Sequence, residues 1–303
     1  MPPEHTGDQP GAPTQAIGQD GGGLRITAVI PAWNAAGFVD KAVRSMREQL
    51  APPDEVIVVD DGSDDDTAGV AARAGARVIR RSNGGPAAAR NTGIRATSSE
   101  WIALLDADDV SSVHRLERQR PCLGDPRVAV VFGARSPRAP APPATLNFAM
   151  LWERNPIPTS TVLLRRAAWE SVGGFDEAPA LIGVEDYNLW LRLTLARWQF
   201  RAVPESLVEY RPTPASLTMQ TLPFAAAELE NVRRIARLLP LAPEAVRAKE
   251  YRIYRTYGLE LFHRRDWANA RAFLAEAAGR YRLTWPTRAR LLAATVMGRR
   301  GSA

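Results

Sequence analysis

The chain has 303 residues, 45% of them hydrophobic and 24% charged, which is ordinary for a globular protein of one large or two smaller domains. Its net charge of +6 fits an anionic partner but does not separate nucleic acid, a membrane surface and a sugar nucleotide. A single cysteine, Cys122, excludes an internal disulfide framework and a thiolate zinc cluster, and three scattered histidines argue against a histidine metal site.

The first 23 residues are rich in Gly, Pro, Gln and Asp and poor in large apolar side chains, which predicts a disordered tail over residues 1–23. The sequence has no apolar run of about 20 residues, the length that a transmembrane helix needs. It also lacks the basic and then apolar start of a secretory signal. We therefore expect a cytoplasmic protein that is ordered from Leu24 onwards.

Strand and helix patterns alternate from residue 24 to residue 123. Apolar runs predict strands over 25–30, 55–59, 76–79 and 101–105, and helical spacing predicts helices over 38–49, 65–74, 84–96 and 110–123. Pro31 is expected to stop the first strand, and Ser63 or Asp64 to cap the second helix. The alternation is typical of an α/β fold with a mainly parallel sheet flanked by helices.

The second half of the chain has shorter elements and then only helical patterns. The expected elements are strands over 128–132, 160–164, 200–203 and 207–210, a turn over 173–177, helices over 150–155 and 185–196, and after Pro223 helices over 224–239, 243–264, 267–280 and 287–299. Trp267-x-x-Ala270-Arg271-x-x-Leu274-x-x-Ala277 resembles half of a tetratricopeptide hairpin. We therefore expect a C-terminal helical extension over residues 223–303.

Carboxylates crowd the end of the fourth expected strand, in Asp106-Ala-Asp108-Asp109. Asp106 and Asp108 are two positions apart, so in extended chain they point to the same side. A hard divalent cation such as Mg²⁺ or Mn²⁺ would relieve their repulsion. A solvated acidic turn or a helix N-cap remains the alternative for this short motif alone.

Three further polar clusters follow strands, and the carboxyl ends of parallel strands meet at one crevice. The clusters are Pro31-Ala-Trp33-Asn34, Asp60-Asp61-Gly-Ser63 and the turn Gly84–Arg90. An aromatic ring, carboxylates, an arginine and a cation-binding pair are together what a nucleoside diphosphate requires. The crevice is therefore a candidate nucleotide site.

The ordered set of motifs resembles family-2 inverting glycosyltransferases with the GT-A fold, over roughly residues 24–218. The matching pieces are Val29-Ile-Pro-Ala-Trp-Asn34, Val58-Val-Asp-Asp-Gly-Ser63, Ala89-Arg90-Asn91-x-Gly93, Leu105-Asp-Ala-Asp-Asp109, Gly173-Gly-Phe-Asp-Glu177 and Glu185-Asp-Tyr-Asn-Leu-Trp-Leu-Arg192. The resemblance implies a GT-A domain over residues 24–222, with a nucleotide-binding half over 24–109 and an acceptor half over 110–222.

The resemblance also implies roles for single residues. Asp186 is expected to be the catalytic general base, and Asp106 and Asp108 to hold Mn²⁺ or Mg²⁺. The expected nucleotide-binding residues are Pro31, Trp33, Asn34, Asp60, Asp61, Arg90 and Asp106. The expected sugar or acceptor pocket is lined by Asp109, Thr161, Gly174, Phe175, Asp176, Glu185 and Trp190.

The implied function is metal-dependent, inverting transfer of a sugar from a nucleoside-diphosphate sugar, UDP-linked or otherwise, to an acceptor hydroxyl in cell-envelope or polysaccharide synthesis. The acceptor would be a glycan or a lipid-linked molecule, and no nucleic acid is expected. Two alternatives remain open, a nucleotidyltransferase and a non-catalytic scaffold of the same fold. The acids Asp106, Asp108 and Asp186 argue against the scaffold.

One departure from the family and one feature of the C-terminal helices bear on this expectation. Tyr210-Arg211-Pro212-Thr213 stands where many relatives carry Tyr-Arg-x-His, so a histidine metal ligand is absent there. Residues 245–303 hold 13 Lys and Arg against 4 Asp and Glu. Peripheral contact of the segment 281–300, including Trp285, with the inner face of an anionic plasma membrane is one hypothesis, and packing of these helices against the catalytic domain is the other.

Overall fold

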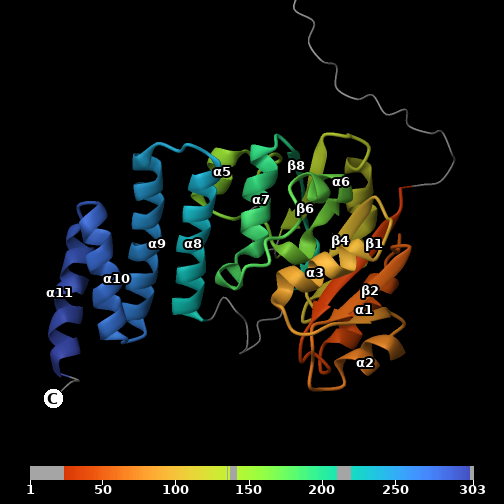
Figure 1. Ribbon diagram of the computed structural model, residues 1–303, viewed down its shortest axis with the longest axis horizontal. Helices are drawn as coiled ribbons and strands as arrows, with labels where there is room; N and C mark the ends of the chain where they lie inside the picture. Colours follow the sequence, from red (N-terminus) through yellow and green to blue (C-terminus); the bar gives the residue numbers. More distant parts are fainter. Residues whose placement is uncertain (1–23, 135, 137–141, 210–219, 301–303) are drawn as a thin grey trace, which may run out of the picture.

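The computed structural model describes residues 24–134, 136, 142–209 and 220–300. A seven-stranded sheet in the order β3-β2-β1-β4-β7-β6-β8 forms its centre, with helices on both faces. Four further helices stand side by side at one end of the molecule (Figure 1). The expected α/β fold with a mainly parallel sheet and a C-terminal helical extension is confirmed.

The first half of the sheet is parallel throughout. Its strands are β1 (Ile26–Ala32), β2 (Glu55–Asp60), β3 (Arg77–Arg80) and β4 (Trp101–Leu104). Alternate residues of β1 pack on opposite faces: Ile26 lies in the apolar cluster of α1 (Val39–Arg47) and α2 (Thr67–Arg73), and Val29 lies in that of α3 (Gly85–Arg95). The strand order reverses between β1 and β4, which is where open α/β sheets bind ligands.

The second half of the sheet is mixed. β7 (Leu163–Arg165) runs antiparallel between β4 and β6 (Val128–Ala134), and β8 (Gln199–Ser206) is parallel to β6. The helices of this half are α4 (Arg115–Gln119), α5 (Phe148–Glu153), α6 (Arg166–Ser171) and α7 (Glu185–Leu195), with short 3₁₀ turns η1 (Arg120–Cys122), η2 (Thr159–Thr161) and η3 (Pro179–Leu181). Helix α6 was not expected from the sequence.

Long-range contacts explain where the observed elements differ from those expected. The predicted helix over 110–123 is wrong at its start, because β5 (Val110–Ser111) pairs with β9 (Val208–Glu209), far along the chain. Pro31 does not end β1, since β4 pairs with β1 only as far as Val29 and no partner there requires the missing N–H.

Two local predictions also differ from the structure. The predicted strand over 160–164 begins later, because residues 159–161 form a 3₁₀ turn in which the Thr161 hydroxyl donates to the Pro158 carbonyl. Neither Ser63 nor Asp64 caps α2; the carboxylate of Asp65 accepts the Thr67 amide instead, at 3.0 Å.

The C-terminal extension consists of α8 (Thr221–Leu238), α9 (Pro243–His263), α10 (Trp267–Arg280) and α11 (Trp285–Arg300). The boundary expected between residues 222 and 223 falls within the first turn of α8. Helix α8 packs on the catalytic domain, because its Val232 and Ile235 belong to the same apolar cluster as Trp190 of α7. In the described part of the chain, no helix has both the length and the apolar character to span a bilayer.

Two expectations fall on residues that the structure does not describe. They concern the tail over residues 1–23 and the segment Tyr210–Thr213, which stands where relatives carry a histidine.

Candidate active site

The loop after β1 presents an exposed aromatic ring. The Trp33 side chain is 58% exposed, and the backbone of Asn34 beside it has a φ of 48°. Asn34 fixes this loop to the loop after β2, because its amide donates to Ser63 Oγ at 2.9 Å and its Oδ1 accepts the Asp64 amide at 2.9 Å. The ring of Trp33, two residues after the half-buried Pro31, is thus held just after the end of β1 and is accessible.

The two carboxylates after β2 are buried and hydrogen-bonded within the protein. Asp60 accepts the Ser63 amide at 3.0 Å and Arg80 Nε at 3.1 Å. Asp61 accepts Arg81 Nη1 at 2.6 Å and the amide of Gly85 at 2.7 Å, at the start of α3. These contacts use most of the hydrogen bonds that the Asp61 carboxylate can accept. Both carboxylates therefore brace the loops of the crevice.

Arg90 on α3 joins the two halves of the domain. Its Nη2 donates to Asp106 Oδ1 at 2.7 Å, and its Nη1 donates to Glu185 Oε1 at 2.6 Å. Burial opposes the charge on Arg90, but the two carboxylates outweigh burial and hold its pKa above the ordinary value. The sequence led us to expect Arg90 near the base and phosphates; its observed partners are the acids after β4 and at the start of α7.

The acids after β4 differ in how far they are exposed. The amide of Asp106 donates to Ser160 Oγ at 3.1 Å, and the Asp106 side chain is 36% exposed. Asp108 is half-buried, whereas Asp109 is buried. Burial lowers the pKa of Arg115 to about 9, and the negative charge of Asp109 acts in the opposite direction. Asp109 therefore belongs to the support of the site.

Asp186 stands in the first turn of α7, next to Glu185. Its Oδ2 accepts the Thr159 hydroxyl at 2.5 Å, and its Oδ1 accepts the Tyr187 amide at 2.5 Å. Burial, followed by the charge of Glu185, raises the pKa of Asp186 to about 6, and the Thr159 hydrogen bond and Arg90 act in the opposite direction. Because Arg90 also contacts Asp106, the start of α7 and the end of β4 lie side by side at this arginine.

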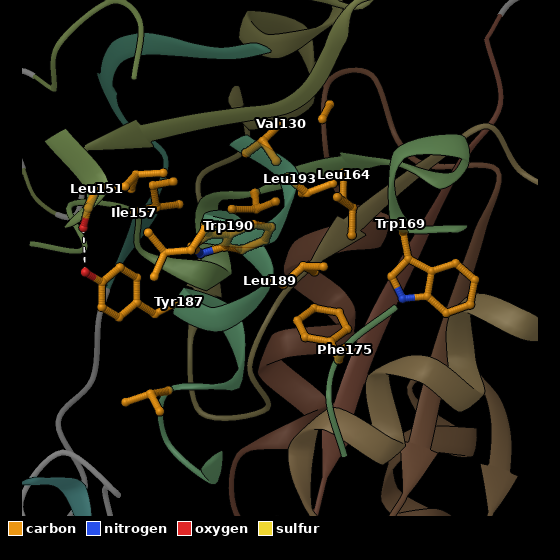
Figure 2. Close-up of a cluster of buried hydrophobic side chains, with 14 of the residues drawn as sticks. Val130, Leu151, Ile157, Leu164, Trp169, Phe175, Tyr187, Leu189, Trp190 and Leu193 are labelled. Carbon is orange, nitrogen blue, oxygen red and sulfur yellow. Dashed lines mark hydrogen bonds between the residues drawn. The ribbon is translucent and has the colours of Figure 1, made fainter. Parts of the chain in front are cut away.

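Several residues expected in the pocket belong to the core instead. Trp190 is fully buried and packs edge-on against Phe175 and Phe200, with ring centroids 6.4 Å apart in both pairs. Figure 2 shows it among Leu189, Leu193 and other apolar side chains. Thr161 is also fully buried and bonds the carbonyl of Pro158. The family resemblance led us to expect these two side chains in the pocket, but neither is exposed in the structure. A resemblance in sequence does not separate a core side chain from a pocket side chain.

The Gly-Gly-Phe-Asp turn stands beside the site and is held from two sides. Gly174 has a φ of 78°, and a Cβ built on it would lie 3.0 Å from Asn91 Oδ1. Phe175 is buried, and its ring lies 5.6 Å from the guanidinium carbon of Arg90. Asp176 accepts Arg234 Nη1 of α8 at 2.7 Å. Within this turn, Phe175 contacts Arg90 of the site, and Asp176 pairs with Arg234 of the C-terminal extension.

Two supporting residues were not singled out from the sequence. Asn91 is buried and makes four hydrogen bonds: its Nδ2 donates to the Phe175 carbonyl at 2.9 Å and to Glu177 at 2.7 Å, and its Oδ1 accepts the Trp169 indole and the Phe175 amide, both at 3.0 Å. The Arg-Asn pair of the α3 motif was the available signal. Lys249 of α9 gave no such signal.

Lys249 connects the extension to the helix that carries Asp186. Its Nζ lies 3.1 Å from the Tyr187 hydroxyl and 3.1 Å from the Glu153 carbonyl. The Tyr187 hydroxyl donates in turn to the Leu151 carbonyl, drawn as a dashed line in Figure 2. The first turn of α7 is therefore held by Lys249 of α9 as well as by Leu151 of α5.

Comparison with known proteins places this geometry in a family. A family model described as Glycosyl transferase family 2 matches residues 27–155, and one described as Glycosyl transferase family group 2 matches residues 101–222. The pre-mycofactocin glycosyltransferase of Mycobacterium tuberculosis is 31% identical over 152 residues, which cover 42% of this chain and 30% of that relative. The uncharacterized glycosyltransferase EpsJ of Bacillus subtilis is 33% identical over 98 residues, or 31% of this chain and 28% of the relative. The matched part thus spans less than a third of the length of these curated relatives.

Solved structures agree in fold. The mannosyltransferase PcManGT from Pyrobaculum calidifontis, in complex with GDP-Man and Mn²⁺, has a TM-score of 0.61 and 22% identity, covering 91% of this chain and 87% of its own. Glucosyl-3-phosphoglycerate synthase from Mycobacterium tuberculosis, with Mn²⁺, UDP and glucosyl-3-phosphoglycerate, has a TM-score of 0.52 and 21% identity, covering 71% and 81%. The family expected from the motifs is confirmed: this chain carries a glycosyltransferase domain of family 2 with the GT-A fold.

Proposed function

We propose that this domain transfers a sugar, with inversion, from a nucleoside-diphosphate sugar to an acceptor hydroxyl, with help from a divalent cation. The observation that carries the proposal is the Arg90 bridge, which joins Asp106 to Glu185, the neighbour of Asp186, through bonds of 2.7 and 2.6 Å. The cation that binds a donor's diphosphate needs a carboxylate ligand, and an acceptor's hydroxyl needs a carboxylate base. The complexes of PcManGT with GDP-Man and of the glucosyl-phosphoglycerate synthase with UDP, both holding Mn²⁺, support this assignment.

In the proposed reaction, Asp186 takes the proton of the acceptor hydroxyl as its oxygen attacks the anomeric carbon. A carboxyl with a pKa of about 6 is largely ionised at neutral pH and is a stronger base than an ordinary aspartate. The Thr159 hydroxyl and the Tyr187 amide orient its two oxygens. The sugar–phosphate bond breaks on the opposite side, which inverts the anomeric centre, and Trp33 is placed to stack on the donor's base.

The chemistry of the site fits a cation shared with the substrate. Asp106 and Asp108 are both half-buried and carry carboxylates, the kind of ligand that Mn²⁺ and Mg²⁺ prefer. In the described residues no three or more His, Cys, Asp or Glu side chains are grouped to hold a metal. Such an ion would therefore complete its shell with phosphate oxygens and water. When bound, it offsets the negative charge of the departing nucleoside diphosphate.

The proposal is tested by measuring nucleoside-diphosphate release from a panel of UDP- and GDP-sugars with Mn²⁺. Asp186→Asn should lower kcat roughly 10²- to 10⁴-fold, the range of general-base contributions, and Asp108→Ala should abolish Mn²⁺-dependent release. Asp40→Asn is the control, because Asp40 pairs with Arg44 on the surface of α1. Full turnover by Asp108→Ala would exclude the cation role.

Other outcomes identify the two alternatives. A nucleotidyltransferase would release pyrophosphate from a nucleoside triphosphate and a sugar phosphate. A non-catalytic scaffold would give no turnover with any donor and would not be stabilised by any of them against heat, although a bound ligand raises the melting point. Glycan and lipid-linked acceptors, tested with the preferred donor, then separate the cell-envelope and polysaccharide roles.

A further inference from the structure

Helix α11 exposes a row of large apolar side chains. Trp285 is 77% exposed, Leu292 64% and Val296 53%. Positions seven and eleven residues after Trp285 return to nearly the same face of a helix, so these three side chains form one stripe. We call it the α11 stripe. Four such apolar side chains, with Met297 beside the stripe at 45% exposure, are more than scattered surface residues account for.

The α11 stripe faces away from the rest of the protein. The opposite side of α11 carries Ala294, which is fully buried in a cluster with Leu261 of α9 and Ala270 of α10. Figure 1 shows α11 at the end of the row of helices, with α10, α9 and α8 between it and the catalytic domain. Packing of this face against the catalytic domain, one of the two alternatives from the sequence, is therefore excluded for the described structure.

The charged side chains around the α11 stripe are all positive. Residues 277–303 contain six arginines and no Asp or Glu. Arg282 and Arg288 are exposed and, within the described residues, form no ion pair with a carboxylate. The Arg290 guanidinium donates to the Pro286 carbonyl of its own helix, at 3.2 Å. Exposed apolar side chains beside arginines that form no ion pair within the described residues suit a surface that is apolar below and anionic above, as a membrane interface is.

We propose that α11 docks this molecule on an anionic membrane surface, with the α11 stripe among the headgroups and upper acyl chains and the arginines on lipid phosphates. A second copy of the chain fits the face less well, because a two-fold contact through α11 would set the same arginines against one another. A hydrophilic outer face would be expected if α11 only capped the helical row. The inference does not depend on the proposed sugar transfer.

The test is co-sedimentation of the full chain with vesicles of phosphatidylglycerol and phosphatidylcholine, compared with phosphatidylcholine alone. Binding should require the anionic lipid and should fall at high salt. Each arginine at such a surface is worth about a fivefold change in partitioning, so Arg282→Gln with Arg288→Gln should weaken binding roughly 25-fold. Leu292→Ser with Val296→Ser should weaken it at least about tenfold.

Matched controls separate the stripe from general surface effects. Leu50→Ser removes another leucine that is 60% exposed, in the catalytic domain, and Arg118→Gln removes another exposed arginine. Both controls should bind like the unaltered chain, and all variants should keep its circular dichroism and melting temperature. Equal binding by the α11 variants, or no binding to anionic vesicles, would overturn the proposal. So would light scattering that shows a dimer lost in the Leu292→Ser, Val296→Ser variant.

Discussion

Nη1 of Arg90 lies 2.6 Å from Oε1 of Glu185, so a buried ion pair joins α3 to the first turn of α7. Both side chains are only 6% exposed. Removing one member of such a pair leaves the other buried and unpaired, which costs about 3–5 kcal/mol. We therefore expect Arg90→Met to lower the free energy of unfolding, measured with urea, by about that amount.

Variants of Glu185 distinguish the effect of the charges in this pair from the effect of side-chain shape. Glu185→Gln keeps an oxygen that can accept from Arg90 and should cost less than Arg90→Met. The double change Arg90→Met with Glu185→Met should recover part of the loss, because no charge of this pair is left unpaired. A loss below about 1 kcal/mol for Arg90→Met would contradict a structural bridge and place this arginine with the exposed pairs.

The pH dependence of turnover follows from the surroundings of Asp186. A general base works when it is deprotonated, so nucleoside-diphosphate release should rise with pH and level off above a pKa of about 6. The Thr159 hydrogen bond lowers this pKa, since it favours the ionised form. Thr159→Val should therefore move the acidic limb of the kcat profile to higher pH.

Thr194→Val is the control for that shift. Thr194 lies near the other end of α7, and its hydroxyl donates to the Leu191 carbonyl at 2.8 Å. The control should leave the acidic limb in place. An unshifted limb in Thr159→Val, at unchanged fold and stability, would mean that another group controls the profile.

The sequence predicted the parts of the fold and site that depend on local pattern. The parallel strands, α10 over Trp267–Arg280 and the position of Asp186 in a first helical turn all follow from apolar spacing and from motifs at strand ends. The bridge through Arg90 depends on two carboxylates, 16 and 95 positions away in the chain. No local pattern encodes such a contact, and the same is true of the pairing between β5 and β9.

The pocket residues illustrate a second limit. Trp190 and Thr161 sit inside matched or apolar segments, where a side chain that fills the core looks like one that lines a cavity. Only the packing decides, and it places Trp190 between Phe175 and Phe200. The sequence did not point to Lys249, because a lysine in a basic helix predicts a solvated side chain. In the structure its ammonium is buried and contacts the Tyr187 hydroxyl.

The turn of residues 173–177 should depend on the amide of Asn91. Its Nδ2 donates to the Phe175 carbonyl and to Glu177, at 2.9 and 2.7 Å. Asn91→Asp replaces the donor by an oxygen that faces two acceptors, so we expect a loss of about 1–3 kcal/mol in unfolding free energy and lower turnover. Asn147→Asp is the matched control: Asn147 only accepts, from the Met150 amide at 2.9 Å, and should tolerate the change. Equal losses in both variants would contradict this assignment.

The seating of α3 on the sheet should depend on Gly93, one turn after Arg90. A Cβ at Gly93 would lie 2.5 Å from Val29 Cγ1 and 3.1 Å from Val59 Cγ2, so the helix would have to lift from β1 and β2. Overpacking of this kind costs about 1–3 kcal/mol, which outweighs the gain of up to about 1 kcal/mol that alanine brings to a helix. Gly93→Ala should therefore lower the melting temperature and, by displacing Arg90, also lower turnover.

Gly279→Ala is the same substitution at a site where we expect the opposite change in melting temperature. No atom lies within 4 Å of a Cβ built at Gly279, which is inside α10. Only the helix preference of alanine then acts, and the variant should melt at the same or a higher temperature with unchanged turnover. If Gly93→Ala were as stable as Gly279→Ala, close packing of α3 on β1 could not be what positions Arg90, and the bridge between the two halves would need another support.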